Sequence, residues 1–453
     1  MAIGNNGNVG ALAGAGKRAA YATDPTKSAF FWLSAFFVVY CARPEDWIPG
    51  LTIIPLAKIT AILAMWGLFN SLGRTKRNYK DRPKEARLLL AMIMLMYVGA
   101  FLSPIWRGGA IVNTMDFSKI YIAWMLVFLL ITTFDRLRRI IFIQAISVVL
   151  ICVVCLIKGH STPRLEGVIG GIYGNPNDLA FAIVLSLPFA LAFMLTAKSP
   201  IKKAFWFVGM LFMLVAIFET ASRAGFINLV ISGSVTLYHF AIKGKRMYLL
   251  VATAFLTVII GIGAGGKLYD RFHALTSNTS GAGHKTDEAE GSYEDRMFLM
   301  KRAVDGIINY PIFGVGARNF PTYSLIWHDV HMTYLQIAVE GGIPVGILFL
   351  MFFRRAFVNL KILKKEKNLD EDIVLFVGAL YSSLVGFVIG ALFAPEAYQL
   401  FPYYSVAFTA ALLQTIRERE QTPGSVAPPP VKPRHFLEVY ANRGTTGAVS
   451  PVR

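Results

Sequence analysis

The sequence contains few charged residues for its length. They make up 16% of the 453 positions, whereas hydrophobic residues make up 55% and the mean hydropathy is +0.53. A soluble fold of this length could not bury so much apolar surface, so the composition excludes a soluble globular protein. We therefore expect a chain that lies in lipid, where its 13% aromatic residues suit lipid-facing helices and interfacial belts.

Cysteine is also scarce, with three residues in the chain. Cys152 and Cys155 form a C-x-x-C pattern within an apolar segment. Because a membrane helix offers such a pattern no redox scaffold, we expect packing of small side chains there rather than redox chemistry. The first 27 residues lack the apolar core of a cleavable signal peptide, and we expect them to form a flexible cytoplasmic arm.

Long apolar segments, in contrast, are abundant. About 20 apolar residues in a helix cross the hydrocarbon core of a bilayer. The sequence predicts an all-α, polytopic integral membrane protein with about twelve transmembrane helices. Their approximate cores are 28–41, 53–72, 88–106, 117–133, 139–157, 177–196, 202–219, 225–242, 247–265, 331–353, 372–394 and 398–416.

The distribution of Lys and Arg predicts the orientation of these helices. With the N-terminus in the cytoplasm, the inner segments hold 31 of the 45 basic residues, and the five short outer loops hold 5. Cytoplasmic loops of membrane proteins carry this excess of positive charge. We therefore expect both termini in the cytoplasm, and the net charge of +18 is explained by topology rather than by nucleic-acid binding.

The chain divides into three predicted regions. They are the cytoplasmic arm 1–27, a membrane domain 28–416 and a cytoplasmic tail 417–453 that we expect to be disordered. The one long connection, 266–330, falls on the outer side in this topology. Its part 294–310 has helical spacing and is closed by Pro311, so we expect short helices in an extracytoplasmic loop.

Unusual polar residues gather in the predicted outer loops. Arg43 lies in the first of these loops, Asn175 and Asn177 in the third, and Arg223 in a tight turn between two apolar spans. An ionisable residue at such a boundary is costly unless it is paired or wetted, so Arg223 is a candidate functional residue. Snorkelling to lipid headgroups or pairing with Glu219 would also explain it. Asn177 would suit a helix cap equally well.

Two histidines, His328 and His331, lie at the mouth of a predicted span. A histidine there can move a proton near neutral pH, although an interfacial role is the simpler explanation for either one alone. The pair could share a metal ion, but no third ligand has supportive spacing. Glu340 follows His331 by nine residues, so the two would lie on opposite sides of one straight helix and could not form a dyad.

Together, these outer segments resemble the O-antigen ligase and O-antigen polymerase family of bacterial membrane proteins. The matching segments, in chain order, are Gly-Asn-Pro-Asn-x-Leu-Ala at 174–180, Ser-Arg-Ala-Gly at 222–225, Arg296, Pro-x-x-Gly-x-Gly at 311–316 and His-x-x-Tyr-Leu-Gln-x-x-x-Glu-x-Gly at 331–342. Met332 is a departure, since the family usually has Asn after the histidine. The Arg-Pro-Glu-Asp-Trp segment at 43–47 looks like a ligase-like branch associated with exopolysaccharide and O-glycosylation clusters.

The resemblance implies a glycosyltransferase at the outer face of the bacterial inner membrane, with no cofactor. Such proteins transfer a glycan from an undecaprenyl-pyrophosphate carrier to an acceptor hydroxyl, without metal and with inversion. The implied catalytic residues are His331, as base for the acceptor, and Arg223 and Arg296, as bidentate donors to the pyrophosphate. Residues expected to bind substrate are Arg43, Asn175, Asn177, Arg318, Tyr334 and Glu340.

Several alternatives remain open at this point. The acceptor can be a glycan, a lipid A core or a protein, so a polymerase or a protein O-oligosaccharyltransferase fits the same chemistry. A different transferase would place a metal ion on Glu45 or Asp46 in the first outer loop. A lipid-linked glycan flippase or transporter would need charges buried in mid-span, whereas the candidate residues here cluster at one face.

Overall fold

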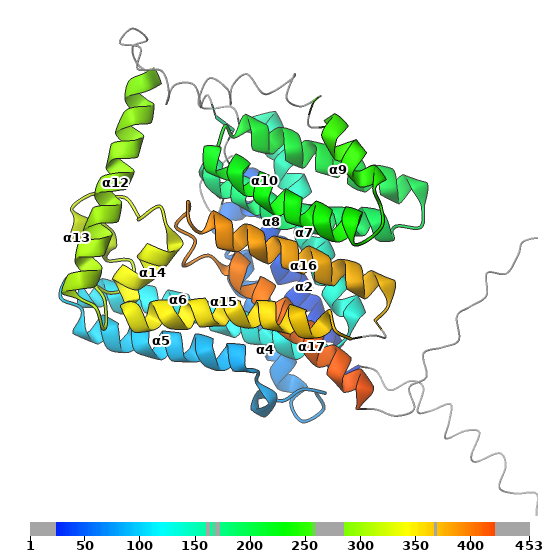
Figure 1. The fold of residues 1–453 in the computed structure, drawn as a ribbon. Helices are drawn as coiled ribbons and strands as arrows, with labels where there is room; N and C mark the ends of the chain where they lie inside the picture. The colour runs from blue at the N-terminus through cyan, green and yellow to red at the C-terminus, as the bar shows by residue number, and fades with distance from the viewer. Residues whose placement is uncertain are drawn as a thin grey trace, which may run out of the picture. The chain divides into compact units, whose positions relative to one another are not determined.

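The computed structural model describes residues 24–159, 164, 165, 167, 173–256, 258, 285–366 and 369–421. Within these ranges every regular element is helical and no strand occurs (Figure 1). The all-α prediction is therefore confirmed. Eight helical segments among the described residues are long and apolar enough to cross a membrane. They are α5 (Lys84–Leu102), α6 (Arg107–Leu130), α7 (Phe134–Lys158), α8 (Pro176–Thr196), α9 (Pro200–Glu219), α10 (Arg223–Leu237) with the π-helix η4 (Tyr238–Ile242), α15 (Ile343–Leu363) and α16 (Glu371–Gly390).

Shorter helices complete the described part of the chain. They are α2 (Lys27–Ala42), α3 (Pro44–Trp47), η1 (Leu51–Ile53), α4 (Leu56–Asn70), η2 (Tyr79–Asp81), α12 (Lys285–Asn309), α13 (Phe320–Ser324), α14 (Thr333–Gly341) and α17 (Leu400–Glu420). α2 and α4 are apolar but short. The total of about twelve spans stays a prediction, and residues 257 and 259–265 of the predicted span 247–265 lie outside the described residues.

One predicted span was wrong. The segment 331–353 is not a single helix, because α14 ends at Gly341 and α15 begins at Ile343. Gly342 between them has φ +84, and a Cβ on it would lie 2.2 Å from the carbonyl oxygen of Ile312. Only glycine fits that backbone and that approach, so the chain turns here instead of continuing one helix.

The amphipathic helix predicted at 294–310 is confirmed with different ends. α12 begins at Lys285 and ends at Asn309, just before Pro311. Proline cannot donate the backbone hydrogen bond that would continue the helix, which accounts for the C-terminal end.

The two most buried of the eight long helices are α8 and α16, in each of which 72% of an apolar 18-residue stretch is buried. α16 packs against α8, α10 and α15, and α8 also packs against α7 and α9. α5 packs between α6 and α15, and these three helices run side by side in Figure 1. Residues up to Leu413 form one compact unit and those from Gln414 form a second.

The connections predicted to be outer loops meet at one end of these helices. Tyr173 donates a hydrogen bond through its hydroxyl to the carbonyl of Cys41, at 2.8 Å. The backbone N–H of Leu400 donates to the hydroxyl of Tyr40. Ser103, after α5, donates to the carbonyl of Val315 at 2.7 Å. Segments far apart in the sequence are thus fastened together where the candidate residues lie.

Candidate active site

The Pro-x-x-Gly-x-Gly segment holds the C-terminal end of α14. The backbone N–H of Val315 donates to the carbonyl of Val339 at 2.9 Å, and that of Gly316 donates to the carbonyl of Glu340 at 3.0 Å. Gly314 has φ +67, and a Cβ there would lie 2.6 Å from the Glu340 carbonyl group. The glycines therefore allow two backbones to approach closely, and the contact fixes the place of Glu340.

An apolar cluster packs α12 against α14 and the segment before it. Its buried members are Leu299, Ala303, Val315, Phe320, Val330 and Val339. Arg296 precedes Leu299 by one helical turn, so it lies on the face of α12 that is directed toward α14. Met332 packs against this cluster as well, so the residue that departs from the family pattern contributes to apolar packing.

His331 lies directly before α14 and is partly buried. Burial, together with the charges of Arg296 and His328, lowers the pKa of His331 to about 4. The charge of Arg296 therefore acts on His331, and the resemblance implies a catalytic role for both residues. In the described ranges, no three His, Cys, Asp or Glu side chains form a group suited to a metal ion.

Arg223 is the first residue of α10, after the tight turn that ends α9 at Glu219. Ser222 caps α10, since its hydroxyl oxygen accepts from the backbone N–H of Gly225 at 3.0 Å. Nη1 of Arg223 is buried and has no hydrogen-bond partner among the described residues. A buried donor that lacks a partner is costly, so this nitrogen marks a position where an acceptor on a ligand would be stabilised.

The structure corrects the role considered for Asn177. The cap of α8 is Asn175, whose side-chain oxygen accepts from the backbone N–H groups of Asn177 at 2.8 Å and Asp178 at 3.0 Å. Asn177 instead accepts a hydrogen bond of 2.7 Å from the hydroxyl of Ser222 and one of 3.4 Å from Arg164. Asn177 thus joins the N-terminal ends of α8 and α10, next to Arg223.

The connection between α16 and α17 also reaches the candidate site, which the sequence did not predict. The hydroxyl of Thr333 donates to the carbonyl of Ala394 at 2.6 Å and accepts from the backbone N–H of Glu396 at 2.9 Å. The side chain of Glu396 is hydrogen-bonded to Asp178. Burial raises the pKa of Glu396, and the neighbouring Asp178 raises it further. This connection links the start of α8, beside Arg223, to the start of α14, beside His331.

Glu340 belongs to a second cluster of polar residues, which also contains Tyr398, Asp329 and Arg318. It is 1% exposed, accepts a hydrogen bond from the hydroxyl of Tyr398, and its Oε1 is buried without a partner among the described residues. Burial raises its pKa to about 8, with a further contribution from the charge of Asp329. The guanidinium of Arg318 lies 5.1 Å from the centre of the Tyr398 ring. Neither Tyr398 nor Asp329 was predicted from the sequence. Asp329 could have been identified by the argument used for Arg223, because it is also an ionisable residue at a helix boundary.

Arg43 and Tyr334 use their polar groups inside the protein. Arg43 ends α2 in a left-handed conformation and forms an ion pair with Asp46. The hydroxyl of Tyr334 donates to the carbonyl of Val388 in α16 at 2.8 Å. These contacts position the first loop and α14, and a role of either residue in substrate binding stays a prediction.

Comparison with known proteins shows what the chain is similar to. Residues 208–350 match the family model described as O-antigen ligase, and this range contains Arg223, Arg296, His331 and Glu340. The chain is also similar to the teichuronic acid biosynthesis protein TuaE of Bacillus subtilis (strain 168). The two are 21% identical over 367 residues, which cover 75% of this chain and 74% of TuaE. The resemblance to the O-antigen ligase and polymerase family is therefore confirmed.

Proposed function

We propose that this membrane protein transfers a glycan from an undecaprenyl-pyrophosphate carrier to an acceptor hydroxyl, at the helix ends where Arg223, Arg296 and His331 lie. The buried, unpartnered Nη1 of Arg223 carries the proposal. A phosphate oxygen is the acceptor that best satisfies a guanidinium N–H, because a planar cation and an anionic oxygen form a strong charge-assisted hydrogen bond. The family match adds support, since the family acts on lipid-linked glycans.

In the proposed reaction, the acceptor oxygen attacks the anomeric carbon of the glycan while the bond to the pyrophosphate oxygen breaks. His331 takes the proton of the acceptor hydroxyl. The two arginines stabilise the negative charge that grows on the leaving pyrophosphate. Attack from the side opposite the leaving group inverts the anomeric centre, and in this proposal the two arginines supply the cations that the leaving pyrophosphate needs.

The low pKa of His331 fits the role of a base that must be neutral before substrate arrives. With a pKa of about 4, the ring is unprotonated at neutral pH. A bound pyrophosphate would compensate the charge of Arg296 and thereby raise the pKa of His331 toward the operating pH, where a general base works best.

A polymerase that extends a carrier-linked glycan is the second candidate. It fits the family match and the similarity to a teichuronic acid biosynthesis protein equally. A protein O-oligosaccharyltransferase would use the same chemistry with another acceptor. We favour transfer at the outer face of the inner membrane for each, because the Lys and Arg distribution predicts that these helix ends lie outside.

The chemical identity of the product tests the proposal. Glycans would be compared in cells with and without the protein. If the protein is a ligase, carrier-linked glycan of normal length should accumulate in cells that lack it. If it is a polymerase, cells that lack it should carry single repeat units on the carrier. Unchanged glycans in both the carrier-linked and the transferred pools would contradict either activity, and glycan trapped on the cytoplasmic face would indicate a flippase.

A further inference from the structure

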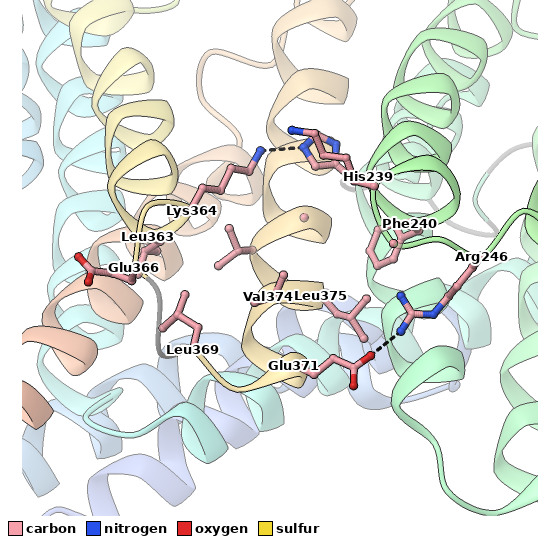
Figure 2. A pocket seen from close by; sticks show the side chains of 14 residues that line it. His239, Phe240, Arg246, Leu363, Lys364, Glu366, Leu369, Glu371, Val374 and Leu375 are labelled. Carbon is pink, nitrogen blue, oxygen red and sulfur yellow. Dashed lines mark hydrogen bonds and ion pairs between the residues drawn. The ribbon is translucent and has the colours of Figure 1, made fainter.

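A cavity lies at the end of α16 opposite the candidate active site. Its walls come from η4 at the end of α10, the C-terminal end of α15 and the N-terminal end of α16 (Figure 2). Gly390, at the other end of α16, precedes the connection that carries Glu396. The cavity volume of about 360 Å³ falls within the range of ligand pockets, about 300–1,000 Å³.

The cavity combines an apolar wall with a basic mouth. The apolar lining includes Phe240, Leu363, Leu369, Val374 and Leu375. The basic lining residues are Lys243, Arg246 and Lys364. A ligand that fills this space should therefore carry a negative charge at one end and hydrocarbon at the other.

Two of the three cations lack an acidic partner. Arg246 forms an ion pair with Glu371 at 2.7 Å. Lys243 and Lys364 form no ion pair with any carboxylate in the described ranges, and each lies over an aromatic ring instead. The Nζ atom of Lys243 is 5.2 Å from the ring centre of Tyr238, and that of Lys364 is 3.8 Å from the ring centre of Tyr381.

His239 fixes the position of Lys364. Its Nδ1 lies 3.0 Å from the carbonyl of Val235, which can only accept, so Nδ1 carries the proton. Nε2 then has a free electron pair and accepts from Lys364 at 2.7 Å, as Figure 2 shows. Lys364 is thus held at the mouth of the cavity by a neutral imidazole, and its charge remains uncompensated.

The two lysines also repel each other. Burial, together with the charge of Lys243, lowers the pKa of Lys364 to about 8. Glu366 lies at the rim with its carboxylate directed away from Lys364 (Figure 2). An anion bound between Lys243 and Lys364 would remove this repulsion and satisfy both side chains.

We propose that this cavity binds the phosphate-bearing headgroup of an anionic phospholipid, with Lys243 and Lys364 on the phosphate and an acyl chain along the apolar wall. A lipid is favoured over a free phosphate because the wall is apolar and the neighbouring Ile242 and Val374 expose apolar side chains, 52% and 53% exposed. Basic pockets between helix ends at a membrane surface recognise such headgroups.

Binding of phosphatidylglycerol to the purified full-length protein tests the site. Native mass spectrometry would compare the wild-type protein, Lys243→Gln with Lys364→Gln, and the control Lys245→Gln with Lys365→Gln. The control removes the same charge from the same two segments, at side chains that do not line the cavity. Each lysine near an anionic headgroup contributes about a fivefold factor in affinity, so the cavity variant should lose about 25-fold while the control keeps wild-type affinity.

Further measurements separate the outcomes. Lys243→Arg with Lys364→Arg should retain the lipid, because the charges remain. If the double glutamine variant does not fold, Lys243→Gln alone should still lose about fivefold. Equal affinity in the cavity and control variants would overturn the proposal in favour of general surface attraction. Displacement of the lipid by an equal concentration of inorganic phosphate would overturn the lipid assignment.

Discussion

Gly314 lies directly against the main chain of Glu340. A Cβ at Gly314 would be 2.6 Å from both the carbonyl carbon and the carbonyl oxygen of Glu340. Two sequence motifs of the family resemblance therefore form one structure, in which the glycine-containing segment fixes the end of α14 and with it a buried carboxyl group. Gly314 therefore affects the geometry of the site through a backbone contact and takes no part in the chemistry.

Gly314→Ala should therefore destabilise the protein and reduce transfer. The left-handed conformation alone costs an alanine roughly 1–2 kcal/mol, and the close backbone adds to this. Unfolding temperature in detergent and transfer activity would be measured. Gly346→Ala is the control, because its Cβ would meet only Ala338 at an ordinary distance of 3.5 Å and alanine favours the helix α15. Equal stability of the two variants would show that the contact with Glu340 is not required.

Glu340→Gln should remove a pH dependence of stability. The folded-state pKa of Glu340, about 8, lies above the value of about 4.3 for an unfolded glutamate. The unfolded chain therefore releases this proton first, and stability is lost as pH rises from about 4 to about 8. Glutamine cannot ionise, so the unfolding temperature of Glu340→Gln relative to the wild type should rise between pH 5 and pH 8. Glu294→Gln, at an exposed position on α12, should not show this trend.

The sequence predicted the helices well, because long apolar runs leave little choice of structure in lipid. It misjudged 331–353 because hydropathy is continuous across Gly342, and only the approach of Ile312 forces the break. Asn175 and Asn177 show that the role of a single residue is harder to predict from sequence than the position of a helix. Both are plausible caps in sequence, and the partner that distinguishes them, Ser222, lies on another helix.

The predicted site residues were found through their charges at helix boundaries and through the family resemblance. Neither signal reports which distant segments meet. Tyr398 and Glu396 act on Glu340 and Asp178 only because the connection after α16 folds back against α14 through Thr333. Long-range contacts of this kind follow from tertiary packing and could not be read from spacing.

The orientation in the membrane stays a prediction and can be tested by labelling. Single cysteines would replace Lys80 and Trp327 in a cysteine-free protein, and intact spheroplasts would be treated with a membrane-impermeant maleimide. The charge distribution predicts labelling at 327 and none at 80 until the membrane is opened. Trp327 is 86% exposed, so lack of reaction there would not result from burial in the fold. The reverse pattern would invert the topology and place the candidate active site in the cytoplasm.

His331→Ala should lower turnover by about 10²- to 10⁴-fold, the usual contribution of a positioned base. His328→Ala should have a mild effect. Because the pKa of His331 is lowered to about 4, kcat/KM should fall only as pH drops toward 4, when the ring takes up a proton. Removing the charge in Arg296→Gln should move this fall to higher pH, measured on the residual activity. Large and equal losses in both histidine variants, restored by zinc, would instead indicate a shared metal ion.

The last prediction separates pyrophosphate recognition from membrane anchoring at Arg223 and Arg296. An arginine that reaches for lipid headgroups needs only a positive charge on a long side chain, so lysine should replace it at little cost. An arginine that holds a leaving pyrophosphate must direct two N–H groups at phosphate oxygens, and a lysine cannot reproduce that fork. A hydrogen bond to a charged group contributes about 1.5–3 kcal/mol, so each lysine variant should slow transfer by roughly ten- to 150-fold.

Arg107→Lys is the matched control for both arginines. Arg107 is exposed at the start of α6. The turn before α6 lies at the same end of the helices as the candidate site, because Ser103 in this turn is hydrogen-bonded to Val315. Arg107→Lys should transfer glycan at the wild-type rate when it is expressed at the wild-type level. Since Arg223 and Arg296 would stabilise the same leaving group, the double lysine variant should lose less than the product of the two single losses. If Arg223→Lys and Arg296→Lys both transferred glycan at the rate of Arg107→Lys, neither side chain would bind the leaving group, and the unpartnered Nη1 of Arg223 would need another explanation.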